Sequence, residues 1–191
     1  MDASGPGPSI VLIGFMGAGK STAARALALA LGEPCHDTDD LIERREGRPV
    51  ERIFAEDGEA RFREIEQQVV LEALDKGGVA ALGGGALGSA RTREALTGHL
   101  VVLCDVDEET AWDRCAGSNR PLANDRAEFR RRYAERAPLY TAAARAFLPA
   151  GGAEAGALAG PWLARLRDLP EVRFAWARTA SGHYPVIVGP G

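Results

Sequence analysis

Short apolar runs alternate with longer amphipathic segments along most of this chain. Runs with the length and aliphatic content of buried strands lie at residues 9–13, 79–82, 100–104 and 147–149, with a shorter candidate at 33–36. Apolar residues at helical spacing, between glycine and proline breaks, predict helices over 21–31, 41–46, 50–56, 59–75, 108–116, 126–145 and 161–169. Strands and helices that alternate in this way predict an α/β fold, a doubly wound parallel sheet of about five strands flanked by helices.

The chain length allows one sizeable core and a tail, because the sequence has 191 residues. We expect residues 1–8 to be a disordered leader and residues 9–170 to form the α/β domain. The remaining residues, 171–191, are a tail in which 172–177 and 184–189 are strand-like. The prediction is therefore one domain with an appended segment.

Charge and hydropathy narrow the class of protein. A net charge of −4 and a pI near 5.5 argue against general nucleic-acid binding, so any positively charged site must be local. No apolar run approaches the roughly 18 residues that span a bilayer, and the N-terminus lacks the basic and apolar regions of a signal peptide. We therefore expect no nucleic-acid partner, no membrane partner and a cytoplasmic location. The cysteines and histidines show no metal-ligand spacing.

One segment, GFMGAGKS at residues 14–21, matches the phosphate-binding P-loop pattern G-x-x-x-x-G-K-[ST]. It stands between an aliphatic strand and a run of good helix formers, which is the context that the motif requires. Its glycines allow a tight turn that aims backbone N–H groups at a polyphosphate, next to the positive end of the following helix. We expect Lys20 to reach the β- and γ-phosphates of a nucleotide and the Ser21 hydroxyl to bind Mg²⁺.

Two carboxylates follow the short second strand. If Asp37 and Asp39 lie in extended backbone, their side chains point to the same side of the chain. Asp37 then holds Mg²⁺ through water, and Asp39 accepts a proton or hydrogen bond from a substrate hydroxyl. The alternative is that Asp39 or Asp40 caps the helix that begins at Leu41.

Arginines provide the remaining candidate chemistry. Arg63 and Arg136 lie on predicted helices, and each is either a solvated surface residue or part of a bidentate site for a substrate carboxylate. The stretch 119–136 is basic and turn-rich at its start, which suits a lid that closes over phosphates. Arg120, before a proline and off the helix, favours the lid over a solvated helix face. The triple glycine at 83–85 indicates backbone that approaches a ligand closely.

Taken together, these residues resemble shikimate kinase over about residues 9–150. The motifs that carry the resemblance occur in the family's order with similar spacing: GFMGAGKST at 14–22, DTD at 37–39, FREIE at 62–66, GGG at 83–85, NRPL at 119–122 and RAPLY at 136–140. The P-loop alone specifies only an NTP-binding protein, whereas the combination is far more specific. The resemblance implies transfer of the γ-phosphoryl of MgATP to the 3-hydroxyl of shikimate, with ATP as co-substrate and Mg²⁺ as cofactor.

The resemblance also implies a role for each matching residue. Lys20, Asp39 and Arg120 are the catalytic candidates, with Arg120 as the lid arginine, and Glu66 orients Arg63 and the substrate. The residues implied for ATP are Gly14, Gly17, Ala18, Gly19, Lys20, Ser21, Thr22, Arg114 and Arg120. The residues implied for shikimate are Asp39, Arg63, Gly84, Gly85 and Arg136, and those implied for Mg²⁺ are Ser21 and Asp37, the latter through water.

Two features depart from the family's pattern. Residues 150–156 are glycine and alanine with one glutamate, where we expect a polar loop that contacts adenine. The tail resembles the opening strands of a dehydroquinate synthase domain, through YPVIVG at 184–189, so the chain is either the kinase half of a fusion or ends in a hairpin that packs on the kinase. Two other functions stay open: another small-molecule P-loop kinase, such as gluconate kinase, and a nucleotide-binding regulatory module without turnover.

Overall fold

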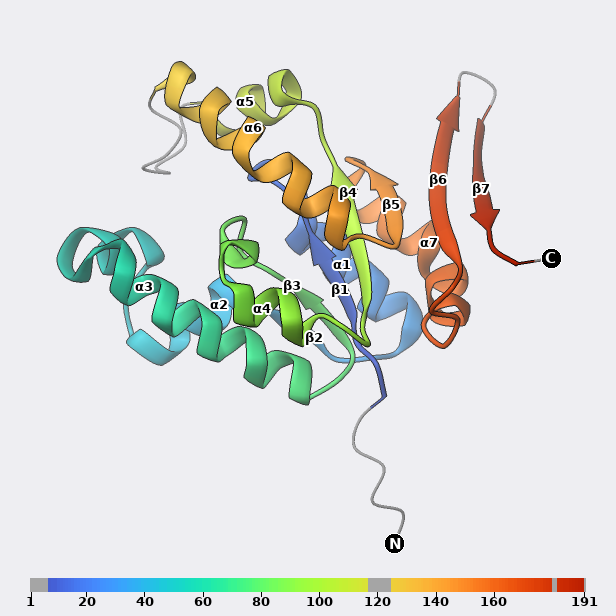
Figure 1. The fold of residues 1–191 in the computed structure, drawn as a ribbon, viewed down its shortest axis with the longest axis horizontal. Helices are drawn as coiled ribbons and strands as arrows, with labels where there is room; N and C mark the ends of the chain where they lie inside the picture. The colour runs from blue at the N-terminus through green and yellow to red at the C-terminus, as the bar shows by residue number, and fades with distance from the viewer. Residues whose placement is uncertain (1–6, 117–124, 180–181, 191) are drawn as a thin grey trace, which may run out of the picture.

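The computed structural model describes residues 7–116, 125–179 and 182–190, which form a single mixed sheet with helices on both faces (Figure 1). The strands are β1 Ile10–Ile13, β2 Cys35–Asp37, β3 Val79–Ala81, β4 Leu100–Asp105, β5 Ala146–Pro149, β6 Arg173–Thr179 and β7 Gly182–Val188. The helices are α1 Lys20–Leu31, α2 Thr38–Glu46, α3 Val50–Asp75, α4 Ala90–Ala95, α5 Glu108–Cys115, α6 Arg126–Ala143 and α7 Gly152–Leu166, with a 3₁₀ turn, η1, at Ala86–Gly88.

The sheet has the strand order β2-β3-β1-β4-β5-β6-β7. Neighbouring strands from β2 to β6 are parallel, and only β7 runs antiparallel to its neighbour. In Figure 1, α1 and α7 lie behind the sheet while α4 and α6 lie in front of it. The predicted doubly wound α/β fold is therefore confirmed, and the tail adds two strands to the five that were expected.

The central strand explains where a site forms. Every residue of β1 is buried, because β1 lies between β3 and β4 and has helices on both faces. The strands β1, β2 and β3 are parallel, so their carboxyl ends meet at one edge of the sheet. Residues 14–21 and 38–39 follow the ends of β1 and β2 directly, and residues 83–85 follow the end of β3 after Leu82. Loops at this edge are where open α/β sheets bind ligands.

One region was predicted wrongly. Helix α7 begins at Gly152, whereas the glycine- and alanine-rich stretch gave only a weak signal and the helix was expected to start near residue 161. Small residues are required here because α7 packs closely on α1. A Cβ atom on Gly156 would lie 2.3 Å from the Ala23 carbonyl oxygen, and one on Gly160 would lie 3.4 Å from Leu27 Cδ1. The glycine- and alanine-rich composition of this stretch therefore reflects close packing between two helices and not a loop. The short elements α4 and η1 were also missed.

A glycine separates the two helices predicted at 50–56 and 59–75. The structure runs them together as α3, but Gly58 has φ 82° and ψ 167°, which is not helical. The helix axis thus changes direction at Gly58. Ile42 of α2 and Ile53 of the first segment pack against Phe62 of the second segment in a small separate core. This core carries the aromatic side of the site described below.

The tail forms the hairpin that one of the two interpretations expected. Strand β6 pairs with β5 and with β7, and Phe174 is buried against the main core. The outer strand β7 leaves Tyr184, Val186, Ile187 and Val188 exposed. Among the described helices, none is long and apolar enough to cross a membrane.

Candidate active site

The P-loop follows β1 and wraps its backbone around the start of α1. Gly14, Gly17 and Gly19 have φ values of 142°, 79° and 82°, which are unfavourable for any residue with a side chain. Space is also restricted: a Cβ atom on Gly14 would lie 2.6 Å from the Cys104 carbonyl oxygen, and one on Gly17 would lie 2.9 Å from the Ala111 carbonyl oxygen. The glycines of the motif are therefore required by both conformation and packing.

The start of α1 is suited to an anion. Gly19 is the N-cap residue and gives no side-chain cap, and the first turn of α1 holds no acidic residue. The absence of a capping side chain and of an acid, together with the positive end of the helix dipole, favours an anion at this turn. Lys20 donates from Nζ to the Phe15 carbonyl oxygen across 3.1 Å, which holds the ammonium group over the loop. Ser21 and Thr22 follow in the same turn.

The arrangement of Asp37 and Asp39 differs from the prediction. Asp39 lies in the first turn of α2, not in extended backbone, and Asp37 is the N-cap residue, whose carboxylate accepts from the Asp39 N–H at 3.2 Å. The expected shared side of a strand is therefore wrong, and so is the expectation that Asp39 or Asp40 makes the cap. Asp37 adopts β geometry and Asp39 helical geometry because the strand ends at the capping residue. Both side chains nevertheless line the same cavity.

Asp37 is in a suitable place for a water-mediated metal ligand. Its side chain is buried, and one carboxylate oxygen lies 3.7 Å from Arg25 Nη2. The described residues contain no group of three or more His, Cys, Asp or Glu side chains that could hold a metal ion by themselves. A hydroxyl from Ser21, a carboxylate reached through water and phosphate oxygens are hard oxygen ligands, and this set fits Mg²⁺, which keeps several waters.

The triple glycine follows β3 and is held from two sides. Thr38, fully buried, accepts a hydrogen bond from the Gly83 N–H at 3.0 Å through its side-chain oxygen. The Tyr140 hydroxyl and Arg136 Nη1 both donate to the Gly84 carbonyl oxygen, the latter at 3.2 Å. These contacts fix the loop at 83–85 between α2 and α6.

Two of these glycines, Gly83 and Gly85, leave no room for a side chain. A Cβ atom on Gly83 would lie 2.5 Å from a carboxylate oxygen of Glu66 and 3.0 Å from one of Asp39. One on Gly85 would lie 2.2 Å from Arg63 Nη1. The loop thus brings its backbone within contact distance of three charged side chains, while the close approach of this backbone to a ligand stays a prediction.

Arg63 is held by two carboxylates of its own helix. Its Nη1 donates to Glu66 at 2.6 Å and its Nη2 to Glu59 at 3.0 Å. The guanidinium carbon also lies 5.2 Å from the Phe62 ring centroid and 5.7 Å from that of Phe54. Burial acts to lower the pKa of Arg63, but the attraction of Glu66 and the hydrogen bonds to both glutamates outweigh it, so the group stays charged. Arg63 is therefore not a solvated surface residue.

Glu66 is the most buried acid beside the site, with only 3% of the residue exposed. Burial raises its pKa, while the charge and hydrogen bond of Arg63 oppose that change. Asp39 raises the same pKa and Arg136 lowers it, which places all four charges in one electrostatic group. The orienting role expected for Glu66 toward Arg63 agrees with this geometry.

Arg136 reaches the same place from α6. It donates to Gly84 O, its guanidinium carbon lies 6.0 Å from the Phe15 ring centroid, and among the described residues it has no carboxylate within 4.0 Å. A partly buried guanidinium whose N–H groups are not paired with a protein carboxylate is suited to bind the carboxylate of a ligand. The structure thus brings Arg63 and Arg136 together from two helices.

These residues enclose a cavity of about 380 Å³ beside the P-loop. Its charged lining includes Asp37, Asp39, Arg63, Glu66 and Arg136, its backbone lining is Gly83, Gly84 and Gly85, and Ser21 contributes from α1. Val50, Phe54, Phe62 and Met16 supply apolar wall. Sequence reasoning missed Thr38, Phe54 and Tyr140, since their roles depend on contacts with distant segments; the position of Thr38 inside DTD and of Tyr140 inside RAPLY was the available signal.

The nucleotide side of the site is partly described. Arg114, on α5, donates to the Gly17 carbonyl oxygen at 3.0 Å and to the Ala150 carbonyl oxygen at 3.2 Å, so it bridges the P-loop and the segment after β5. Gly152 lies next to that loop, because its Cβ position is 3.7 Å from Thr22 Cγ2. Arg120 and the predicted start of the lid lie outside the described residues.

A P-loop after the central strand of a parallel sheet, with a cavity of opposed charges beside it, defines a P-loop kinase for a small molecule. A family model for shikimate kinase matches residues 16–166. The chain belongs to the shikimate kinase family.

Relatives and solved structures agree with this assignment. The shikimate kinase of Mycobacterium avium (strain 104) is 51% identical over 142 residues, which cover 72% of this chain and 81% of the relative. That of Mycobacterium ulcerans (strain Agy99) is 44% identical over 180 residues, 92% of this chain and 97% of the relative. Among solved structures, shikimate kinase from Acinetobacter baumannii in complex with shikimate has a TM-score of 0.75 at 35% identity, covering 84% of this chain and 92% of that chain.

Proposed function

We propose that this chain transfers the γ-phosphoryl group of MgATP to the 3-hydroxyl of shikimate. The observation that carries the proposal is the cavity in which Arg63 and Arg136 converge on the backbone of Gly84 and Gly85, beside Ser21 of the P-loop. Shikimate is a hydroxylated carboxylate, so it needs cations at one end and an acid near the reacting hydroxyl. Family membership supports the same activity, since shikimate kinases use ATP as co-substrate with Mg²⁺.

The substrate carboxylate is assigned to the two arginines. No acid of the described segments pairs with Arg136, and Arg63 is held in place by Glu66. A bidentate pair of guanidinium groups fixes both the position and the orientation of a carboxylate. The N–H groups of Gly84 and Gly85 are assigned to ring hydroxyls, because the absence of side chains lets a ligand approach the backbone there.

Phosphoryl transfer is assigned to residues on both sides of the cavity. Asp39 orients the 3-hydroxyl and takes its proton, while Lys20 and the first turn of α1 hold the phosphates. Mg²⁺, when bound through Ser21 and, by way of water, Asp37, neutralises phosphate charge. Arg120 is assigned the lid position by resemblance, and Arg114 the face of the adenine. Catalysis of this kind consists mainly of positioning and electrostatics.

An acceptor panel in a coupled ADP-release assay tests the proposal. Purified full chain with MgATP should release ADP rapidly with shikimate and only at background with gluconate or with no acceptor. Turnover with gluconate alone would favour another small-molecule kinase, and ATP binding without acceptor-dependent release would favour a regulatory module. Arg136→Ala should raise the shikimate KM strongly and leave the ATP KM unchanged; equal loss of both would contradict the carboxylate assignment.

The domain boundaries and the tail belong to the same proposal. Residues 9–170 are assigned as the kinase unit, with a cytoplasmic location. The alternative that the tail opens a dehydroquinate synthase domain rests on residues 184–189 alone, whereas the pairing of β6 with β5 supports a hairpin that belongs to the kinase sheet. The mass of the native polypeptide decides between them, since a fusion requires a much larger product that also carries dehydroquinate synthase activity.

A further inference from the structure

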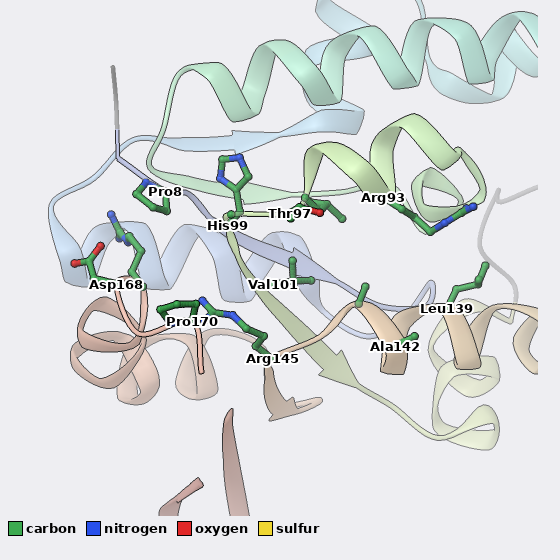
Figure 2. Close-up of a pocket in the computed structure, with 14 residues that line it drawn as sticks. Pro8, Arg93, Thr97, His99, Val101, Leu139, Ala142, Arg145, Asp168 and Pro170 are labelled. Atoms are coloured by element: carbon green, nitrogen blue, oxygen red, sulfur yellow. The ribbon is translucent and has the colours of Figure 1, made fainter. Parts of the chain in front are cut away.

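A second and larger cavity lies away from the kinase site. It has a volume of about 760 Å³ and opens beside the start of β4, between α4, the end of α6 and the segment after α7 (Figure 2). In the view of Figure 2, Pro8, Asp168 and Pro170 lie toward one end and Arg93 and Leu139 toward the other. Since β1 and β4 are parallel, the start of β4 is at the opposite edge of the sheet from the P-loop. None of the kinase residues discussed above lines it.

The lining is mainly apolar but carries excess positive charge. Leu96, Val101, Leu139, Ala142 and Ala143 form apolar wall. The charged lining consists of three arginines and one acid, Arg93, Arg145, Arg167 and Asp168. Of the arginines, Arg167 is already paired with Glu33 at 2.8 Å. The cavity therefore keeps two cations, Arg93 and Arg145, that have no carboxylate within 4.0 Å among the described residues.

Arg145 is the better anchor for an anion of these two. It is partly buried, and its Nη1 donates to the Leu169 carbonyl oxygen at 2.9 Å, which is the one hydrogen bond of this guanidinium within the part of the chain that the structure describes. Burial lowers the pKa of Arg145, and the charge of Glu171 opposes this change. A guanidinium of this kind gains from a carboxylate.

We propose that this cavity binds a small organic carboxylate with an apolar body. The carboxylate pairs with Arg145, and the apolar body covers Val101, Leu139 and Ala142. Cavities of several hundred Å³ with apolar walls and a few placed polar groups are the usual form of small-molecule sites. Charge complementarity selects the anion, and the apolar wall selects against inorganic phosphate or sulfate.

The cavity is linked to the kinase site through two contacts. Arg93 Nη1 donates to the carbonyl oxygens of Leu87 at 2.6 Å and Gly88 at 3.1 Å, in the 3₁₀ turn that follows the triple glycine. On α6, Leu139 lines the cavity, while its neighbour Tyr140 donates to the Gly84 carbonyl oxygen. We expect an occupant that displaces either element to displace the glycine loop as well; this coupling rests on the proposed binding of shikimate there, and the expected change in shikimate affinity is several-fold, the usual size of such coupling.

A fluorinated probe tests the site directly. Binding of 3-(4-fluorophenyl)propionate to the full chain is followed by fluorine NMR, with the neutral amide of the same acid as control. The acid should bind saturably and the amide much more weakly. Arg145→Gln, which removes the charge but keeps a polar side chain, should weaken binding about tenfold, as loss of a charged hydrogen bond does. Arg165→Gln on the exposed side of α7 should leave binding unchanged.

A second variant and a competition with shikimate show which of the two cavities holds the probe. Ala142→Glu places a negative charge in the larger cavity while Arg145 itself is kept, and it should also weaken binding of the anionic probe. Loss of binding at saturating shikimate together with no effect of Arg145→Gln would put the probe in the kinase cavity and overturn the proposal, as would no saturable binding up to the solubility limit. Binding with an unchanged shikimate KM would overturn the coupling. The probe-binding readouts are independent of turnover, so they test the cavity even if the proposed kinase activity fails, whereas the shikimate KM tests the coupling and requires that activity.

Discussion

Arg63 Nη1 lies 2.6 Å from a carboxylate oxygen of Glu66, and Glu66 is 3% exposed, so the arginine that faces the acceptor cavity is held by a buried acid. The second partner of Arg63, Glu59, has a side chain that is 53% exposed. Glu66 and Glu59 can therefore be compared directly: both contact the same guanidinium, but only Glu66 is buried.

Glu66→Gln should raise the shikimate KM about tenfold or more, since a charged hydrogen bond that orients Arg63 is replaced by a neutral one. The ATP KM should stay within about twofold to threefold of the wild-type value, because changes at separated sites act nearly independently. Glu59→Gln is the control and should change neither constant appreciably, because exposed ion pairs contribute little. Steady-state kinetics of both variants measure this, and equal effects would show that burial of the pair is irrelevant.

Asp39→Asn should lower kcat about 100-fold or more, since the amide cannot take the proton of the acceptor hydroxyl. Stability should change little because the Asp39 side chain is exposed in the first turn of α2. Asp40→Asn, in the same turn and paired with Arg25, loses the same favourable interaction with the helix dipole and serves as control. Near-normal kcat for Asp39→Asn would remove Asp39 from the catalytic role.

Thr38→Val should destabilise the protein by about 1–3 kcal/mol, because the buried Gly83 N–H loses its acceptor. It should also raise the shikimate KM, since the glycine loop is then held from one side only. Thr38→Ser keeps the oxygen and should restore both properties. Denaturant unfolding and kinetics measured together test this, and a serine variant as impaired as the valine one would point to loss of the methyl group instead.

Stability should fall in mild acid partly through His99. Its Nδ1 accepts from the Ser9 N–H at 2.8 Å, and burial lowers its pKa, with Asp75 partly opposing. A lowered pKa in the folded state means that the stability contribution is present above the unfolded pKa of about 6.5 and is lost as pH falls through the folded value.

The measurement is denaturant unfolding of the wild type and His99→Gln at roughly pH 7.5 and 5.5. The wild type should lose more stability between the two than the variant does. The remaining loss in the variant includes His36, whose pKa is also lowered by burial and by Lys76. An identical loss in both proteins would mean that His99 has no part in the response.

The amino-acid pattern by itself determined the sheet, the P-loop and the division of α3. Each of these depends on local causes: aliphatic runs of strand length, glycines where only positive φ fits, and a helix break at Gly58. The same pattern did not predict the start of α7. Gly156 and Gly160 are glycines because α7 lies close to α1 there, and no local signal distinguishes such glycines from those of a loop.

Only the tertiary structure decided how the site is assembled. Thr38 and Gly83 are 45 positions apart, and Arg136 and Gly84 are 52 apart, so neither hydrogen bond leaves a trace in local spacing. The role of Asp37 as the cap of α2 depended on where the strand ended, which apolar patterning locates only to within a few residues. The sequence thus proposed most of the charged residues that line the cavity, whereas packing of α2, α3 and α6 against the sheet determined which of them meet and added Thr38, Phe54 and Tyr140.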